Sequence, residues 1–205
     1  MNDKFYALPK EKQERIINAG FRVFSRNTYR KSPVQEIADE AGISKSLLFF
    51  YFKNKKELYL FLWKKVEEIT RAALAESKCY EATNIFDMMY LGLVAKVNIM
   101  RNYPDITAFS VNAYYEDDKD VSDDIRKIVK PYTKLETNQK IPPLDPKDFK
   151  EGLDLNMMYR DMYLASEGYV WQLSKEGQID IDKFLSEYKD MIEFWRKMYA
   201  READT

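Results

Sequence analysis

The sequence predicts an all-α protein, and three observations lead to that fold class. Apolar residues recur at helical spacing along most of the 205 residues, no stretch shows β-alternation, and Gly (6) and Pro (7) are scarce. Charge then suggests two regions. Residues 1–65 contain 14 Lys or Arg and 7 Asp or Glu, a net charge of +7, whereas the remainder carries −8. A basic head on an acidic body is typical of a phosphate-binding module joined to a domain that does not bind phosphate.

The composition argues against several function classes. Histidine is absent and Cys79 is the single cysteine, which excludes Ser-His-Asp and Cys-His catalysis and zinc sites of the Cys/His type. We therefore expect neither an enzyme nor a metal or other cofactor. Cys79 cannot form an internal disulfide, no apolar run is long enough to span a membrane, and the N-terminus lacks an apolar signal core. These features predict a cytoplasmic protein.

The N-terminal third predicts four helices. The first covers 10–24 and stops near Asn27, a residue that tolerates a left-handed conformation. A short helix follows Ser32, with Gln35 three residues later as in a capping box, and ends at Gly42. The next extends from Lys45 to Tyr51. A second capping box at Asn54 opens a long helix over 54–75.

The remaining two thirds also predict helices, over about 82–101, 104–115, 122–138, 146–175 and 181–201. The run from Glu116 to Asp120 lies between two of them. Its carboxylates suggest calcium, but the run lacks the spacing and the Gly of an EF-hand loop. We expect a solvated acidic loop.

A helix-turn-helix pattern lies within the basic region. Ala38 is small where two helices would cross, Gly42 suits a turn that needs positive φ, and Ile37, Ile43 and Leu48 would hold the second helix against the first. The second helix could then enter the DNA major groove. A helical hairpin in an ordinary bundle is the alternative.

The surrounding residues narrow this interpretation. The run from Ala19 to Leu58, with IADEAGISKSLLFFYFKNKKEL over 37–58, resembles the TetR family of bacterial transcriptional regulators. The resemblance implies a helix-turn-helix DNA-binding domain over 1–53 and a helical ligand-binding and dimerisation domain over 54–205. The departures from the family pattern are Thr28, Ser46, Leu47, Phe49 and Phe50, and they prevent any transfer of operator preference.

The resemblance also assigns DNA-contacting roles. Ser32 and Val34 match phosphate contacts, as do Tyr51 and Lys55, and Gln35 either reads a base or completes the capping box with Ser32. Lys45 could reach guanine or phosphate, and Leu47 a thymine methyl. The full candidate set is Ser32, Val34, Gln35, Lys45, Ser46, Leu47, Phe49, Phe50, Tyr51 and Lys55.

Two further sets of candidate residues lie in the rest of the chain, one for a dimer interface and one for a ligand cavity. An apolar stripe along the last predicted helix suggests a homodimer seam, although it could also be the inner face of a monomer. Its candidate interface residues are Phe184, Tyr188, Met191, Ile192, Trp195 and Tyr199. Aromatic and Met side chains suggest an adaptable ligand cavity. Its candidate lining residues are Phe86, Met89, Tyr90, Leu93, Phe109, Tyr114, Met158, Tyr159, Met162, Tyr163 and Trp171.

Together these features predict a homodimeric repressor that a small apolar or aromatic molecule releases from palindromic double-stranded DNA. The alternative is a DNA-binding adaptor that answers to a protein partner and has no small-molecule effector. An all-helical enzyme is opposed by the missing histidine.

Overall fold

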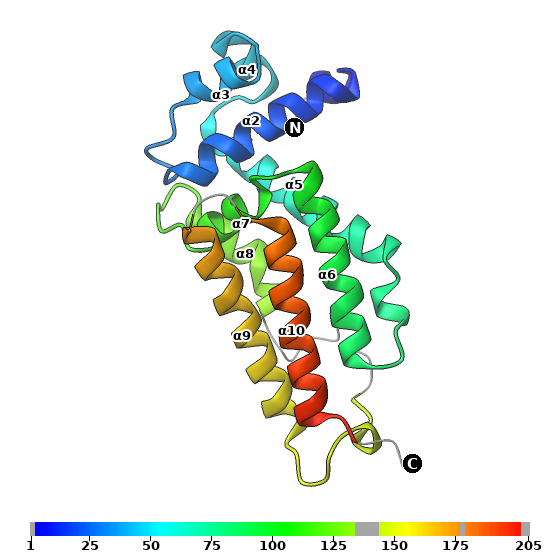
Figure 1. The fold of residues 1–205 in the computed structure, drawn as a ribbon. Coiled ribbons are helices and arrows are strands. Elements are labelled where there is room, and N and C mark those ends of the chain that lie inside the picture. Colours follow the sequence, from blue (N-terminus) through cyan, green and yellow to red (C-terminus); the bar gives the residue numbers. More distant parts are fainter. Residues whose placement is uncertain (1–2, 134–143, 177–178, 202–205) are drawn as a thin grey trace. The chain divides into compact units, whose positions relative to one another are not determined.

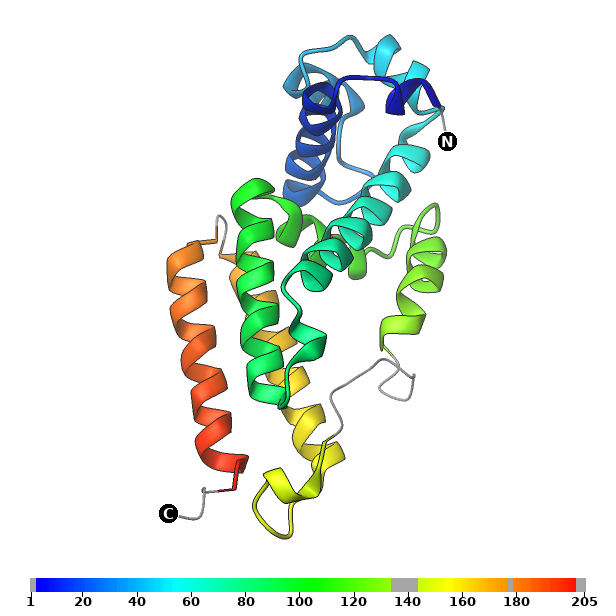
Figure 2. The ribbon, with the colours of Figure 1, turned by 90° about the vertical axis from the view of Figure 1, so that its right-hand side faces the viewer.

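The structure is a computed structural model that describes residues 3–133, 144–176 and 179–201, and within them it is all-α, with no named strand (Figures 1 and 2). Its helices are α1 (Asp3–Tyr6), α2 (Lys10–Arg26), α3 (Val34–Glu40), α4 (Lys45–Tyr51), α5 (Lys55–Glu76), α6 (Ile85–Asn102), α7 (Ile106–Tyr114), α8 (Ser122–Thr133), α9 (Leu155–Lys175) and α10 (Ile181–Tyr199), with short 3-10 turns at Cys79–Glu81 and Pro146–Asp148. None of these helices is long and apolar enough to cross a membrane.

The chain packs as two compact units. Unit 1 consists of the described residues up to 69 together with 103–133, and unit 2 consists of 70–102 together with the described residues from 144 onward. The sequence suggests a single domain boundary after residue 53. In the structure, α7 and α8 pack with the N-terminal helices. Helix α5 contributes to both units, because the division falls between Ile69 and Thr70.

Unit 1 has an aromatic core. The Phe109 ring of α7 is fully buried, and its centroid lies 5.2 Å from that of Phe21 and 5.4 Å from that of Tyr59. Phe24 meets Tyr59 edge-to-face at 4.8 Å. Gly20 permits close packing of α2 on α5, because a Cβ there would lie 2.5 Å from a Leu62 methyl carbon. The core therefore joins α2, α5 and α7 through interlocked rings.

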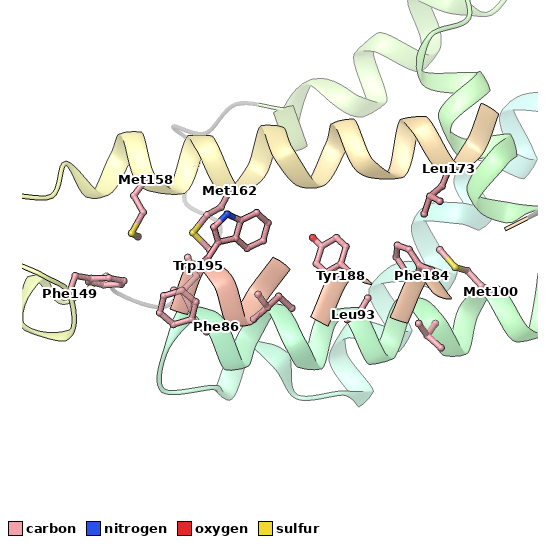
Figure 3. Close-up of a cluster of buried hydrophobic side chains, with 13 residues drawn as sticks. Phe86, Leu93, Met100, Phe149, Met158, Met162, Leu173, Phe184, Tyr188 and Trp195 are labelled. Carbon is pink, nitrogen blue, oxygen red and sulfur yellow. The ribbon is translucent and has the colours of Figure 1, made fainter. Parts of the chain in front are cut away.

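Unit 2 packs α6, α9 and α10 around a cluster of Met and aromatic side chains, which Figure 3 shows. From α10, Phe184, Tyr188 and Trp195 point into this cluster, and Met158 and Met162 enter it from α9. A single antiparallel bridge between Phe149 and Ala200 holds the segment before α9 to the end of α10.

The observed helices differ from the expected ones at several places. Asn27 is extended (φ −137°) rather than left-handed. The helix expected from 146 begins at Leu155, because the Asp154 carboxylate accepts the N–H groups of Asn156 and Met157. Residues 134–138 of the expected helix over 122–138 lie outside the described residues. The short helix α1 was not expected from the sequence.

Candidate DNA-binding surface and effector cavity

The helix-turn-helix geometry rests on the turn at Gly42. Its φ is +68°, a conformation that side chains rarely adopt, as the sequence pattern predicts. The N–H of Ile43 donates to the carbonyl of Ala38 at 3.0 Å, and the Ser44 hydroxyl accepts the N–H of Leu47 at 3.1 Å and so caps α4. Leu48 lies on the buried face of α4. These contacts fix α4 relative to α3.

Helix α4 presents a mixed apolar and basic surface to solvent. Lys45 and Ser46 are exposed, and Leu47, Phe49 and Phe50 are 36%, 37% and 48% exposed. Such a surface can contact thymine methyl groups and guanine or phosphate oxygens, which fits the role expected for these residues.

Two neighbouring rings are not part of that surface. Tyr51 is 8% exposed and Phe52 is buried, and both pack against Phe5 of α1. The phosphate contact expected of Tyr51 therefore has little of the side chain available.

The start of α3 differs from the expected capping box. Ser32 is buried and its hydroxyl donates to the carbonyl of Thr28 at 2.9 Å, so in this conformation it is turned away from any phosphate. The cap position is Pro33, and no side chain caps the helix. Gln35 is exposed and donates to Asp39 at 2.8 Å, which removes its capping role and leaves the base-reading one open. Val34 is half-buried.

The expected cap at Asn54 is present, although the return bond from Glu57 goes to the residue before Asn54. The side-chain oxygen of Asn54 accepts the N–H of Glu57 at 2.8 Å, and the Glu57 carboxylate accepts the N–H of Lys53 at 3.1 Å. Lys55, in the first turn of α5, donates to the carbonyl of Arg30 at 3.1 Å, and its ammonium lies 5.0 Å from the Tyr29 ring. Partial burial lowers the pKa of Lys55, and the charges of Asp118 and Glu116 oppose that shift.

The acidic segment, defined as Glu116–Asp124, is bound to the N-terminal helices and is not simply solvated. Glu116 accepts the N–H of Tyr29 at 2.7 Å, Asp118 pairs with Arg30 at 3.2 Å, and Asp124 pairs with Lys56 at 2.7 Å. No cluster of metal-binding side chains occurs among the described residues. The segment therefore places negative charge against Arg30 and Lys56, which adjoin Lys55.

Unit 2 contains a cavity of about 210 Å³. Five of the eleven residues expected to line it do so, namely Met89, Leu93, Tyr159, Met162 and Tyr163. The lining residues outside that set of eleven are Leu74, Cys79, Tyr80, Met88, Gly92, Lys96, Ser166, Glu167 and Tyr188. Helical spacing from the expected ones (89 to 92, 93 to 96, 163 to 166 and 167) could have identified several of them.

The other six expected lining residues lie elsewhere. Phe86 and Met158 are buried in the unit 2 cluster, and Phe109 is buried in unit 1. The exposed ones are Tyr90 on α6, Tyr114 on α7 and Trp171 on α9.

Four of the residues that line the cavity are tyrosines. Burial raises the pKa of both Tyr80 and Tyr159, so these phenols stay neutral and can donate hydrogen bonds. Lys96 and Glu167 contribute one charge of each sign. The cavity can therefore hold a small apolar body with a few oxygen-bearing groups.

The expected dimer seam is largely an inner face. Phe184, Tyr188, Ile192 and Trp195 are all buried in the unit 2 cluster, so these four side chains are not available to a partner. Met191 and Tyr199 are partly buried against the same cluster. On α9 and α10, the large apolar side chains that remain exposed are Met157, Leu164 and Trp171 of α9 and Phe194 and Met198 of α10.

The N-terminal part of the chain is similar in sequence to known regulatory proteins. Residues 16–61 match the family model described as "Bacterial regulatory proteins, tetR family". The chain is 44% identical over 50 residues to the uncharacterized regulator YerO and 36% identical over 56 residues to the fatty acid metabolism regulator protein, both of Bacillus subtilis, and 29% identical over 93 residues to the regulator RutR of Escherichia coli. These matches cover 24%, 27% and 45% of this chain and 17%, 29% and 43% of the relatives.

Solved structures extend the likeness of fold to nearly the whole chain. A TetR family regulator from Chloroflexus aurantiacus aligns over 98% of this chain and 99% of its own, with a TM-score of 0.66 and 21% identity. FadR of Bacillus subtilis, solved with stearoyl-CoA, aligns over 87% of this chain and 96% of its own, with a TM-score of 0.58 and 19% identity. The relatives are named as transcriptional regulators, not as enzymes. Residues 16–61 of the chain therefore match the tetR family of bacterial regulatory proteins, and the likeness over the rest of the chain is one of fold.

Proposed function

We propose that this protein is a sequence-specific DNA-binding transcriptional regulator, a repressor that a small apolar or aromatic ligand releases from a palindromic operator. The observation that carries the proposal is α4. Lys45, Phe49 and Phe50 are exposed along it, Leu48 lies in the core, and the Gly42 turn holds it on α3. A short helix held in this way is suited to the major groove.

A palindromic operator requires two copies of the head, because one recognition helix makes too few contacts for tight specific binding. For the dimer contact we propose the outer face of α9 and α10. Met157, Leu164 and Trp171 are spaced by seven residues, so they lie on one face of α9. Phe194 and Met198 are one turn apart on α10 and are 59% and 48% exposed. Large apolar side chains gathered on an exposed surface are typical of an interface.

The cavity in unit 2 supports a small-molecule effector over a protein-controlled adaptor. Its volume of about 210 Å³ is below the usual range for ligand sites, which is roughly 300–1,000 Å³. Three Met side chains line it, and their flexible thioethers can move to admit a longer apolar chain. Two relatives point to acyl compounds as the first ligands to test, since one is named a fatty acid metabolism regulator and one was solved with stearoyl-CoA.

The experiment is selection of bound duplexes from a random-sequence DNA pool, followed by release of the selected duplex by a panel of fatty acids and acyl-CoA esters. We expect a palindromic sequence whose half-sites are separated by about one helical turn or a multiple of it. Failure to enrich any sequence would contradict sequence-specific binding. Enriched DNA that no small molecule releases would favour the adaptor.

The dimer is tested separately with Phe194→Asp, measured by sedimentation. We expect monomers that bind the selected duplex at least tenfold more weakly, because a carboxylate cannot be buried unpaired in an apolar interface. The matched control is Tyr115→Asp, which places the same charge at a ring that is 60% exposed in unit 1. Dimers of Phe194→Asp with unchanged affinity would rule out this face.

A further inference from the structure

Helix α4 has two long edges, and they are bordered by different cations. Leu47 and Phe50 lie on one edge and Lys45 and Phe49 on the other, since residues three or four apart share a face. Ser46 lies between the two edges. A helix in the major groove has a sugar-phosphate backbone along each edge, so both edges need cations nearby.

The Leu47–Phe50 edge faces the N-terminal segment of the chain. The Lys4 ammonium lies 4.0 Å from the centroid of the Phe50 ring. A depression of about 380 Å³ separates α2 from the turn and α4, and Lys12 and Arg15 line it opposite Leu47. Three cations from the first 15 residues therefore border this edge.

The N-terminal segment is fixed in place rather than loosely attached. Phe5 is fully buried, and its ring centroid lies 5.2 Å from that of Phe52 and 5.0 Å from that of Phe61. The side chain of Gln13 donates to the carbonyls of Tyr6 (3.2 Å) and Leu8 (2.8 Å), which ties the segment to α2. Lys4 is thus held beside α4 before any DNA is bound, which lowers the entropic cost of using it.

The cations near Lys55 are paired with carboxylates, whereas Lys12 and Arg15 are not, within the residues that the structure describes. Arg30 and Lys56, which adjoin Lys55, pair with Asp118 and Asp124 of the acidic segment. Lys12 and Arg15 are exposed and form no ion pair with any carboxylate in the described parts of the chain. The positive charges of Lys12 and Arg15 are therefore available to an external anion.

We propose that Lys4, Lys12 and Arg15 form a second phosphate-binding flank, which contacts the DNA backbone along the Leu47–Phe50 edge of α4. The ligand is a phosphodiester strand of duplex DNA, and recognition is by charge rather than by base. This proposal rests on the proposed function and adds to it, because the family resemblance points to phosphate contacts near Ser32, Tyr51 and Lys55 and to none in the first 15 residues.

The test measures DNA affinity against salt concentration by fluorescence anisotropy, with a labelled random-sequence duplex of about 30 base pairs, roughly three helical turns. Each neutralised phosphate contributes about 0.9 to the slope of log K against log salt concentration. The variant Lys4→Gln/Lys12→Gln/Arg15→Gln should lower the slope by about two to three units for each bound head, and by about twice that amount for a dimer.

The matched control removes three charges from unit 2, as Lys147→Gln/Lys189→Gln/Lys197→Gln, and should leave the slope unchanged. A second variant, Lys12→Arg/Arg15→Lys, keeps the charges and should retain the wild-type slope, which a purely structural role would not predict. Circular dichroism confirms folding of each variant. Wild-type protein that binds no duplex at low salt would contradict the proposed function itself. Wild-type binding with an unchanged slope in the triple Gln variant would overturn the second flank alone.

Discussion

The two units use aromatic-rich sequence in different ways. In unit 1, rings from α2, α5 and α7 pack edge-to-face or tilted around Phe109, which is fully buried. In unit 2, flexible Met side chains are interspersed among the rings, and a cavity of about 210 Å³ remains beside them. Rigid rings suit a unit that holds α4 in one position, and flexible thioethers suit the ligand-binding role that we propose for unit 2.

The largest effect expected from this comparison concerns Phe109. The variant Phe109→Ala should lower the free energy of unfolding by about 3–5 kcal/mol, because the ring is fully enclosed and its loss leaves a cavity. Met162→Leu, in the Met-rich cluster of unit 2, should cost less than about 1.5 kcal/mol. Urea denaturation followed by far-UV circular dichroism measures both. Equal losses would remove the proposed difference between rigid and adaptable cores.

A smaller effect is expected where the acidic segment meets the N-terminal helices in unit 1. The Glu116 carboxylate accepts the N–H groups of Tyr29, Asp117 and Asp118 at 2.7, 3.2 and 3.1 Å. Glu116→Ala should destabilise the protein by about 1–3 kcal/mol, because a half-buried N–H loses its acceptor. The control is Asp117→Ala, which changes an exposed carboxylate and should cost less than about 0.5 kcal/mol. If the two variants unfold alike, Glu116 does not stabilise unit 1.

The smallest effect is expected from the loss of an ion pair in unit 2, and the size of this effect depends on pH. Arg196 donates to Asp87 at 2.7 Å and, with the side chain of Asn84, lowers the pKa of Asp87 below its ordinary value of 3.8. The resulting stability is complete above the unfolded-state pKa and is lost as pH falls through the lower folded-state pKa. Because both side chains are about a third or more exposed, Asp87→Asn should cost no more than about 1 kcal/mol at pH 7.

Denaturation of wild type and Asp87→Asn at a series of pH values checks this prediction. The difference between the two proteins should shrink as pH falls below about 4, because the wild-type carboxylate is then protonated as well. A difference that stays constant down to pH 2 would show that the substitution acts through packing rather than charge.

The sequence predicted those features that depend on nearby residues. The positive φ of Gly42 and the Asn54–Glu57 cap each involve residues within four positions of one another, and each is present. Ser32 is an exception, because its hydroxyl donates back to Thr28 rather than forward along α3. Local spacing does not distinguish those two hydrogen bonds.

Features that depend on distant residues were not predictable in the same way. The spacing along α10 showed an amphipathic helix, but it could not show whether the apolar face covers the chain's own core or a partner. The acidic segment was expected to be solvated because its partners, among them Tyr29 and Arg30, lie nearly 90 positions earlier. The seven-residue spacing of Met157, Leu164 and Trp171 places them on one face of α9, but Trp171 was expected to line the cavity, and only the structure shows that this face is exposed.

The buried thiol of Cys79 provides an internal reporter. It is the only cysteine in the sequence, it is 2% exposed, and it lines the unit 2 cavity, where its sulfur donates to the carbonyl of Leu74 at 3.5 Å. A thiol-reactive reagent can modify it only when the surrounding residues open, so the labelling rate counts those openings. Each effector candidate can therefore be ranked by how far it slows labelling, without DNA and without any engineered probe.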